Sequence, residues 1–247
     1  MTNCFEYFCV QDVCRGMIFY YICIVECHFA MKKIVIVDGG PRKTFNTAAM
    51  LQKIADGIAS VGGDIVVQRV RLYDMVYRGC VSCMACKLKD RVADVCRFRD
   101  GLTPLLEDIA QADGLVLGSP IYFSEVTAQM RALLERMIFP WLSYKDFSLT
   151  PARKMPVILS YTMNADSEQA KAVYQCMGVI EGCLQRAFGD VEHVDAYNTY
   201  QVKNYDRYAL DAFPEPMKRK YREEHWEDDL QRAFDAGRRM AEKVCSL

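Results

Sequence analysis

The stretch Ile34-Val35-Ile36-Val37-Asp38-Gly39-Gly40-Pro41-Arg42-Lys43-Thr44-Phe45-Asn46-Thr47 joins an apolar run to a loop that contains glycine, proline and two cations. The apolar run predicts a strand. The two glycines let the backbone turn sharply, and Arg42 and Lys43 add cationic donors. We expect Asn46 and Thr47 to cap a following helix, whose first N–H groups attract anions. The stretch therefore predicts a phosphate-binding loop between a strand and a helix, and a plain surface turn with two solvated cations is the alternative.

The composition favours a single α/β domain that acts on small molecules. With 247 residues, of which 51% are hydrophobic and 26% charged, the chain is long enough to bury one sizeable core, and a second full domain is not expected. A formal net charge of −1 provides no basic surface for nucleic acid. The 12 cysteines in a chain of this size, several at ligand-like spacing, indicate a reducing cytoplasm rather than a disulfide scaffold.

Residues 1–30 differ in character from the rest of the chain. Their apolar run, Met17–Val25, is too short for a transmembrane helix, which needs about 20 apolar residues. A signal peptide is disfavoured, because acidic residues precede the run and no small-residue cleavage site precedes Met31. We expect Met31-Lys32-Lys33 to be the natural start, residues 1–30 to be a poorly ordered N-terminal extension, and residues 31–247 to form one domain. A peripheral membrane or interaction segment is the alternative for residues 1–30.

From residue 31 onward, short apolar runs alternate with amphipathic segments of helix length. This alternation predicts an α/β fold, in which a doubly wound sheet of five parallel strands has helices on both faces. Its strand order would be 2-1-3-4-5, with a C-terminal helical extension and a ligand crevice where the first and third strands end. The predicted strands are 33–38, 64–70, 114–118, 155–160 and 191–196, and the predicted helices are Thr47–Ser60, Leu102–Ala112, Thr127–Met137, Ser167–Phe188 and a charged helix or helix pair over Glu215–Val244.

Three loops are expected to meet at this crevice. Beside the loop at 39–47 lie Ser119-Pro120-Ile121-Tyr122-Phe123, after the third strand, and Tyr161-Thr162-Met163-Asn164, after the fourth. In content and order these loops resemble those of the NAD(P)H-dependent FMN reductases, a group of flavodoxin-like proteins. Their phosphate loop is typically G-S-P-R-K-x-(G/S)-N-T, and their second loop is S-P-x-Y. The resemblance covers most of residues 31–247.

The resemblance implies that FMN is the cofactor and NAD(P)H a substrate. It assigns the cofactor-binding residues loop by loop: Arg42, Lys43, Asn46 and Thr47 to the FMN phosphate, with Gly40 and Pro41 in the same loop; Ser119, Pro120, Ile121, Tyr122 and Phe123 to the isoalloxazine ring; Thr162 and Asn164 to its pyrimidine edge. This chain departs from the family at Gly40, where serine is usual, and at Phe45, where a small residue is usual.

The chemistry implied by the resemblance belongs to the flavin, so no catalytic side chain is predicted. The electron acceptor would be a quinone, free flavin, a nitro or azo compound, or a redox protein. Relatives are commonly oligomers, and a homo-oligomer is therefore expected. Neither nucleic acid nor a membrane is an expected partner.

A separate group of candidate ligands is Cys80-x-x-Cys83-x-x-Cys86, with Cys96 after a further nine residues. Thiolates at such spacing are able to converge on iron or zinc. The iron-sulfur flavoproteins of the same family bind a 4Fe-4S cluster next to FMN through a compact four-cysteine motif, usually with a shorter last gap. The alternative function is thus an electron-transfer protein that relays between FMN, a cluster and a redox partner. Free or packed thiols are the simpler interpretation of the same cysteines.

Overall fold

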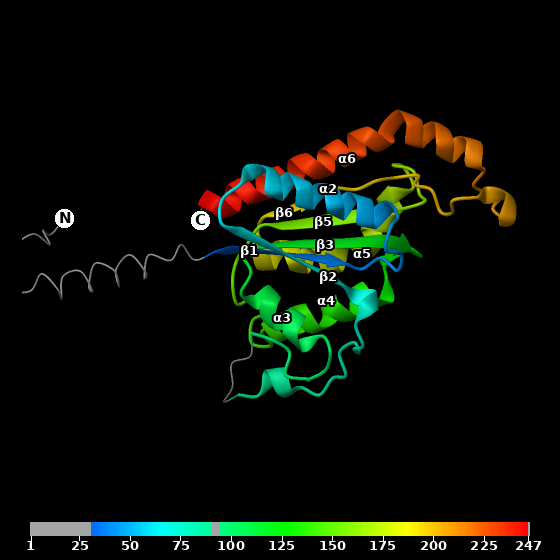
Figure 1. The fold of residues 1–247 in the computed structure, drawn as a ribbon. Helices are drawn as coiled ribbons and strands as arrows, with labels where there is room; N and C mark the ends of the chain where they lie inside the picture. Colours follow the sequence, from blue (N-terminus) through cyan, green and yellow to red (C-terminus); the bar gives the residue numbers. More distant parts are fainter. Residues whose placement is uncertain (1–30, 90–93, 247) are drawn as a thin grey trace, which may run out of the picture. The chain divides into compact units, whose positions relative to one another are not determined.

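Five parallel strands form the centre of the domain in the computed structural model, which describes residues 31–89 and 94–246 (Figure 1). They are β1 (Lys32–Asp38), β2 (Ile65–Arg71), β3 (Gly114–Tyr122), β5 (Val157–Thr162) and β6 (Val191–His193). Their order is β2-β1-β3-β5-β6, so the predicted order 2-1-3-4-5 is confirmed for the parallel strands. A short strand, β4 (Glu125–Val126), pairs antiparallel with the end of β3. The predictions for residues 1–30 lie outside the described residues.

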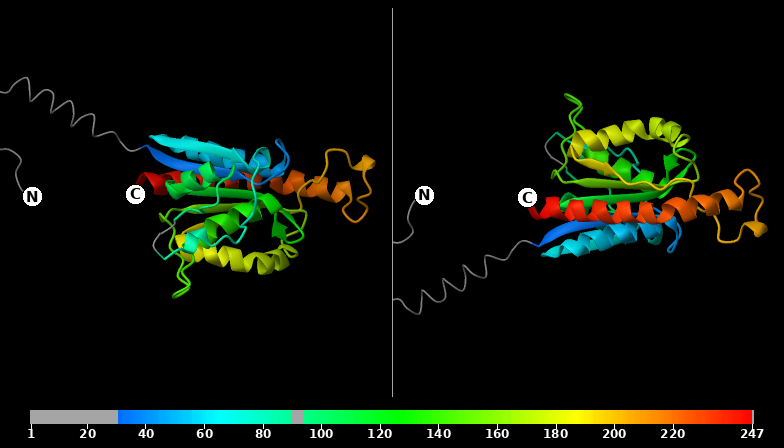
Figure 2. Two further views of the ribbon diagram at one scale, coloured as in Figure 1. Left: turned by 90° about the horizontal axis from the view of Figure 1, so that it is seen from below. Right: turned by 90° about the horizontal axis from the view of Figure 1, so that it is seen from above.

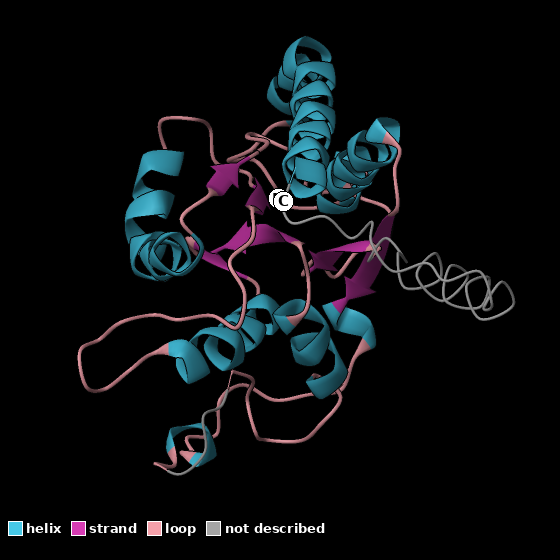
Figure 3. Ribbon diagram, turned by 90° about the vertical axis from the view of Figure 1, so that its left-hand side faces the viewer, coloured by secondary structure: helices cyan, strands magenta, loops and turns pink. Residues whose placement is uncertain are grey.

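Helices cover both faces of this sheet (Figures 1 and 3). Ile34 and Ile36 of β1 pack in one core with α2 (Asn46–Val61) and α6 (Glu215–Ser246). Val35 and Val37 pack in the other core with the remaining helices, which are α3 (Thr103–Ala110), α4 (Ala128–Trp141) and α5 (Ala170–Phe188). Because successive strand residues point to opposite faces and both faces are covered, the centre of β1, residues 34–37, is a continuous apolar run.

The connecting loops contain three short 3₁₀ helices, η1 (Leu72–Asp74), η2 (Ala85–Lys87) and η3 (Tyr205–Arg207). Within the described residues, no helix combines the length and apolar character needed to cross a membrane.

Three element boundaries differ from the sequence prediction for local reasons. β3 continues to Tyr122, because Ile121 and Tyr122 pair with β4, and most of the predicted second loop is therefore strand. α5 begins at Ala170 rather than Ser167, because the Asp166 carboxylate accepts two N–H groups in the preceding turn. The C-terminal extension is one continuous helix and not a pair.

α6 lies directly on α2 through two glycines. A Cβ atom on Gly57 would lie 1.9 Å from the carbonyl oxygen of Phe234, and one on Gly237 would lie 2.0 Å from that of Ile54. Neither position accepts a side chain unless the two helices separate. The N-terminal part of α6 projects past the ends of the strands (Figure 2), so this contact fixes the direction of the projecting segment.

Replacing Gly57 or Gly237 with Ala tests this contact. Each change should lower the free energy of unfolding by about 1–3 kcal/mol, because the new methyl group overpacks the helix interface. Gly178→Ala is the matched control, since it also lies inside a helix but has no atom within 4 Å of an added Cβ. The control should gain up to about 1 kcal/mol from helix propensity. Urea unfolding measures all three, and equal midpoints for Gly57→Ala and the wild type would contradict the close contact.

Candidate functional site

The predicted phosphate loop lies at the carboxyl end of β1 and leads into α2. The Gly39 N–H donates to the carbonyl oxygen of Gly118 at 2.7 Å, which extends the β1–β3 ladder into the loop. Phe45 is the N-cap of α2 and provides no side-chain hydrogen bond. The prediction that Asn46 and Thr47 cap this helix is therefore wrong, because they are its first two residues. With no side-chain cap, the N–H groups of the first turn are available to an anion.

Four of the predicted cofactor-binding residues lie close together at the phosphate loop, namely Gly40, Thr47, Pro120 and Thr162. Thr47 Oγ1 and Thr162 Oγ1 are 2.7 Å apart, and both residues are buried. The register of β3 and β5 places Pro120 opposite Thr162. A Cβ atom on Gly40 would lie 3.5 Å from Thr47 Cβ and 3.7 Å from Pro120 Cδ, so the loop backbone is close to both. Residues predicted for the phosphate and for the ring thus share one corner where β1, β3 and β5 end.

Two hydroxyl groups tie the second loop to the phosphate loop. Ser119 Oγ accepts from the Thr127 N–H at 3.1 Å, and Thr127 Oγ1 donates to the Gly39 carbonyl oxygen at 2.8 Å. Thr127 also caps α4 by accepting from the Met130 N–H. Because Ser119 is wholly buried, it fixes the loop and does not face solvent. Thr127 was predicted at a helix start, but its contact with the phosphate loop was not predicted.

The remaining predicted ring residues lie at the β3–β4 turn. Ile121 is half-buried, Tyr122 is 44% exposed and Phe123 is fully exposed. Phe123 and Ser124 both have left-handed backbones, with φ of 52° and 59°. Such angles are unfavourable for side chains other than glycine, so the pairing of β3 with β4 must hold the turn. The structure therefore leaves Phe123 out of the corner formed by Thr47 and Thr162.

The polar side chains of the phosphate loop point to its other flank. Arg42 Nη1 donates to the carbonyl oxygen of Gln201 at 2.5 Å, and its guanidinium carbon lies 3.6 Å from the centre of the Phe45 ring. Asn46 Nδ2 donates to the carbonyl oxygen of Tyr200 at 2.7 Å. Lys43 and Pro41 are exposed. The corner thus contains loop backbone and Thr47, while Arg42 and Asn46 bind the segment around residue 200.

A buried ion pair supports the loop from β2. Asp38, which is 6% exposed, accepts from the Gly40 N–H at 2.7 Å and lies 3.4 Å from Arg71 Nε. Burial raises the pKa of Asp38, while the Gly40 N–H and Arg71 oppose the shift. This ion pair between Asp38 and Arg71 was not predicted from the sequence. The feature that could have revealed the pair is its position, because Asp38 and Arg71 end neighbouring parallel strands and lie opposite each other in the register.

A buried lysine of α6 holds the third loop. Lys218 Nζ donates to the carbonyl oxygen of Asn164 at 2.9 Å and to Asn198 Oδ1 at 2.5 Å. Burial lowers the pKa of Lys218 to about 8. Asn164 Oδ1 is itself buried without a hydrogen-bond partner among the described residues. In the sequence, Lys218 is one of three consecutive cations in a charged helix, and nothing there marks it as buried.

The pH dependence of unfolding tests the environment of Lys218. The group titrates near pH 10.5 ordinarily and near pH 8 in the folded protein, so the unfolded chain binds more protons between these values. Stability of the wild type should therefore rise with pH in this window, by up to about 1.4 kcal/mol per pH unit. Lys218→Met should lack the rise, and Lys220→Met, an exposed cation of the same helix, should retain it. Urea unfolding near pH 7 and near pH 9.5 makes the measurement, and parallel behaviour of all three proteins would contradict the lowered pKa.

The four predicted cysteine ligands line one small hollow. Cys80, Cys83, Cys86 and Cys96 surround a space of about 10 Å³. Ser82 and Met84, on either side of Cys83, have left-handed backbones, which turn the loop tightly. Within the described residues, no three cysteine, histidine or acidic side chains are close enough together to hold a metal ion. The structure thus places the four thiols along one hollow without forming a metal site.

Arg136 of α4 borders the same hollow and is wholly buried. Its Nη1 binds the Asp100 carboxylate at 2.7 Å, and its Nε has no hydrogen-bond partner among the described residues. Burial opposes the charge of Arg136, but Asp100 and the neighbouring Cys96 raise its pKa. Burial also raises the pKa of Cys86, which Lys87 partly opposes. A buried cation with a free donor therefore faces a group of thiols.

Comparison with known proteins identifies relatives for most of the domain. Residues 32–187 match the sequence model of the family described as NADPH-dependent FMN reductase. An iron-sulfur flavoprotein of Methanocaldococcus jannaschii is 32% identical over 42% of this chain and 51% of its own length. An iron-sulfur flavoprotein of Archaeoglobus fulgidus is 28% identical over 66% of this chain and 74% of its own length. The chain thus spans about half the length of the first of these relatives.

Solved structures share the fold at low sequence identity. An NAD(P)H:quinone oxidoreductase from Methanothermobacter marburgensis superimposes with a TM-score of 0.61 at 15% identity, over 85% of this chain and 96% of its own. An azoreductase from Bacillus anthracis also gives a TM-score of 0.61, at 13% identity, over 85% of this chain and 100% of its own. These likenesses confirm the predicted flavodoxin-like arrangement of strands and helices.

Proposed function

Because this chain belongs to the NADPH-dependent FMN reductase family, we propose that it binds FMN and passes electrons from NAD(P)H to an acceptor. The observation that carries this proposal is the corner where the Gly40 backbone, Thr47, Pro120 and Thr162 meet beside the uncapped end of α2. It lies at the switch point between β1 and β3, where open α/β sheets bind their ligands.

The residues present fit both ends of FMN. The free N–H groups of the α2 first turn, with Arg42 and Lys43 in the same loop, would hold the phosphate. Asn164 Oδ1 is a buried acceptor without a partner in the described chain, and the pyrimidine edge of a flavin carries an N–H donor. An unpaired buried acceptor costs about 1–3 kcal/mol, which a ligand donor would offset.

The protein's part in the reaction is to bind and orient. When bound, FMN supplies the hydride chemistry. Ser119 and Thr127 fix the second loop against the phosphate loop, and Lys218 fixes the loop of Asn164. We propose a small electron acceptor, such as a quinone, free flavin, or a nitro or azo compound. We also propose that the protein is a homo-oligomer. A location in the reducing cytoplasm is part of the same proposal, and the free cysteines of the described residues support that location.

The double variant Arg42→Ala with Lys43→Ala tests the phosphate site. Loss of hydrogen bonds to a charged group costs about 1.5–3 kcal/mol, so FMN should bind at least about tenfold more weakly. Lys145→Ala with Lys154→Ala removes the same charge from exposed positions elsewhere and should bind FMN like the wild type. Quenching of FMN fluorescence on titration gives both affinities. A wild-type protein that purifies colourless and does not take up added FMN would refute the flavoprotein proposal.

A second function, electron transfer through a cysteine-bound iron-sulfur cluster, is favoured by one observation. The four thiols line a single hollow together with the unpaired Nε of Arg136, and a cationic donor would complement a negatively charged cluster. The relatives named iron-sulfur flavoproteins support this proposal. The present space of about 10 Å³ is too small for a cluster, so the thiols would have to spread to accept one.

Cys83→Ser tests this second function. If the four thiols hold a cluster, anaerobically purified wild type should contain iron and acid-labile sulfide, and the variant should lose most of both. Cys176→Ser is the control, because Cys176 is an exposed free cysteine of α5 that does not border the hollow. Equal iron and sulfide in Cys83→Ser and the wild type would rule out these ligands.

A further inference from the structure

A larger hollow lies on the opposite flank of the phosphate loop. It has a volume of about 700 Å³, within the usual range for small-molecule sites, and α2, α6 and the segment around residue 200 surround it. Phe45 and Asn46 border this hollow, whereas Thr47 faces Thr162 at the FMN corner. None of the residues predicted to contact the flavin ring lines it. The hollow is therefore distinct from the proposed flavin corner, although both share the phosphate loop.

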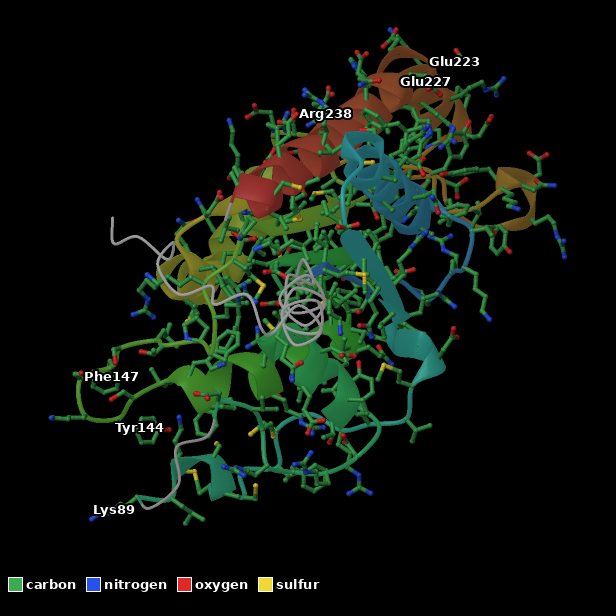
Figure 4. The ribbon with its side chains drawn as sticks, turned by 60° about the vertical axis from the view of Figure 1, so that its left-hand side comes forward. Lys89, Tyr144, Phe147, Glu223, Glu227 and Arg238 are labelled. Carbon is green, nitrogen blue, oxygen red and sulfur yellow. The ribbon has the colours of Figure 1, made fainter. Side chains whose placement is uncertain are left out.

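The lining of this hollow is strongly cationic in a chain whose net charge is −1. Four cations border it, Lys43, Arg69, Lys203 and Arg222, against one carboxylate, Glu215. That carboxylate is already bound by Arg219 and by the Tyr200 hydroxyl. Neither Arg222 nor Lys203 forms an ion pair with any described residue. Nearby acids of α6 do not neutralise the site, because Glu223 and Glu227 point away from the domain (Figure 4).

The hollow also contains a flat platform. The guanidinium carbon of Arg222 lies 4.5 Å from the Trp226 ring centre and 5.7 Å from that of Tyr200. Trp226 is buried, while Arg222 is exposed and lines the hollow. A guanidinium held this way stacks readily on a further aromatic ring. Cations beside such a platform suit a ligand that has both a flat ring and phosphate groups.

We propose that this hollow binds a nucleoside phosphate, with its base on Arg222 and its phosphates near Arg69 and Lys203. This inference rests on the proposed function in one respect, because the expected occupant is the adenosine phosphate end of NAD(P)H. The phosphate loop then serves two ligands. Its Thr47 side faces FMN, and its Phe45 and Asn46 side borders the nicotinamide nucleotide.

Adenosine 2′,5′-bisphosphate is the probe, titrated calorimetrically into the full FMN-loaded chain. The wild type should bind it, and Arg222→Ala should bind it at least about tenfold more weakly, because both the stacking platform and a cation are lost. Lys220→Ala, which removes an exposed α6 cation outside the hollow, should bind it like the wild type. Absence of binding to the wild type, or equal affinity in Arg222→Ala, would overturn the site.

Steady-state kinetics identify the source of the nucleotide. If the occupant is the substrate, Arg222→Ala should raise the KM for NADPH by a similar factor and leave FMN content unchanged. Weakened bisphosphate binding with an unchanged KM would keep the nucleotide site but overturn its assignment to NADPH. Failure of the reductase proposal itself would appear differently, as absent FMN or absent turnover while the calorimetric titration still reports the site.

Discussion

The pairing of β1 with β3 is the constraint on which the site depends. These strands are separated by α2, β2 and α3 in the sequence but lie side by side in the sheet, and the Gly39 N–H bond to Gly118 continues their ladder into the phosphate loop. From their ends the chain leaves toward opposite faces, into α2 after β1 and into α4 after β3. The two loops must therefore separate at this edge, and the crevice between them is a consequence of topology.

Buried charges hold the loops around this crevice. Asp38 binds the Gly40 N–H, Lys218 binds the Asn164 carbonyl, and Arg136 binds Asp100 beside the cysteine loop. Burying a charge is unfavourable unless it is paired and hydrogen-bonded. Each of these groups forms its hydrogen bonds with backbone or side-chain atoms of an irregular segment. The charges therefore define loop geometry more than they add stability. A hydrophobic core could not do this, because it offers no directional contact to a loop backbone.

Structural features that depend on neighbouring residues in the chain can be predicted from the sequence. Side-chain positions that depend on contacts with distant segments cannot. The strand at β1 and the glycine-rich turn were predictable, because burial on both faces and tight turning each leave a direct signature. The positions of the Asn46 and Lys218 side chains were not. Asn46 turns away from the helix end toward Tyr200, and Lys218 is buried against Asn198, so both depend on contacts with residues remote in the chain. The end of β3 was missed for a related reason, since its pairing with β4 forms only after a left-handed turn at Phe123.

The two positions where the loop departs from its family, Gly40 and Phe45, each contact a charged side chain of the same segment. A Cβ atom at position 40 would lie 3.0 Å from Asp38 Oδ1, so the usual serine would press against the carboxylate that holds the Gly40 N–H. Phe45, where a small residue is usual, supports the Arg42 guanidinium and borders the cationic hollow. A small residue there would remove both the stacking surface of Arg42 and part of the hollow's wall. Phe45 therefore contacts both the Arg42 side chain and the proposed nucleotide site. A phenylalanine in place of the family's small residue fits a loop that borders two ligand sites.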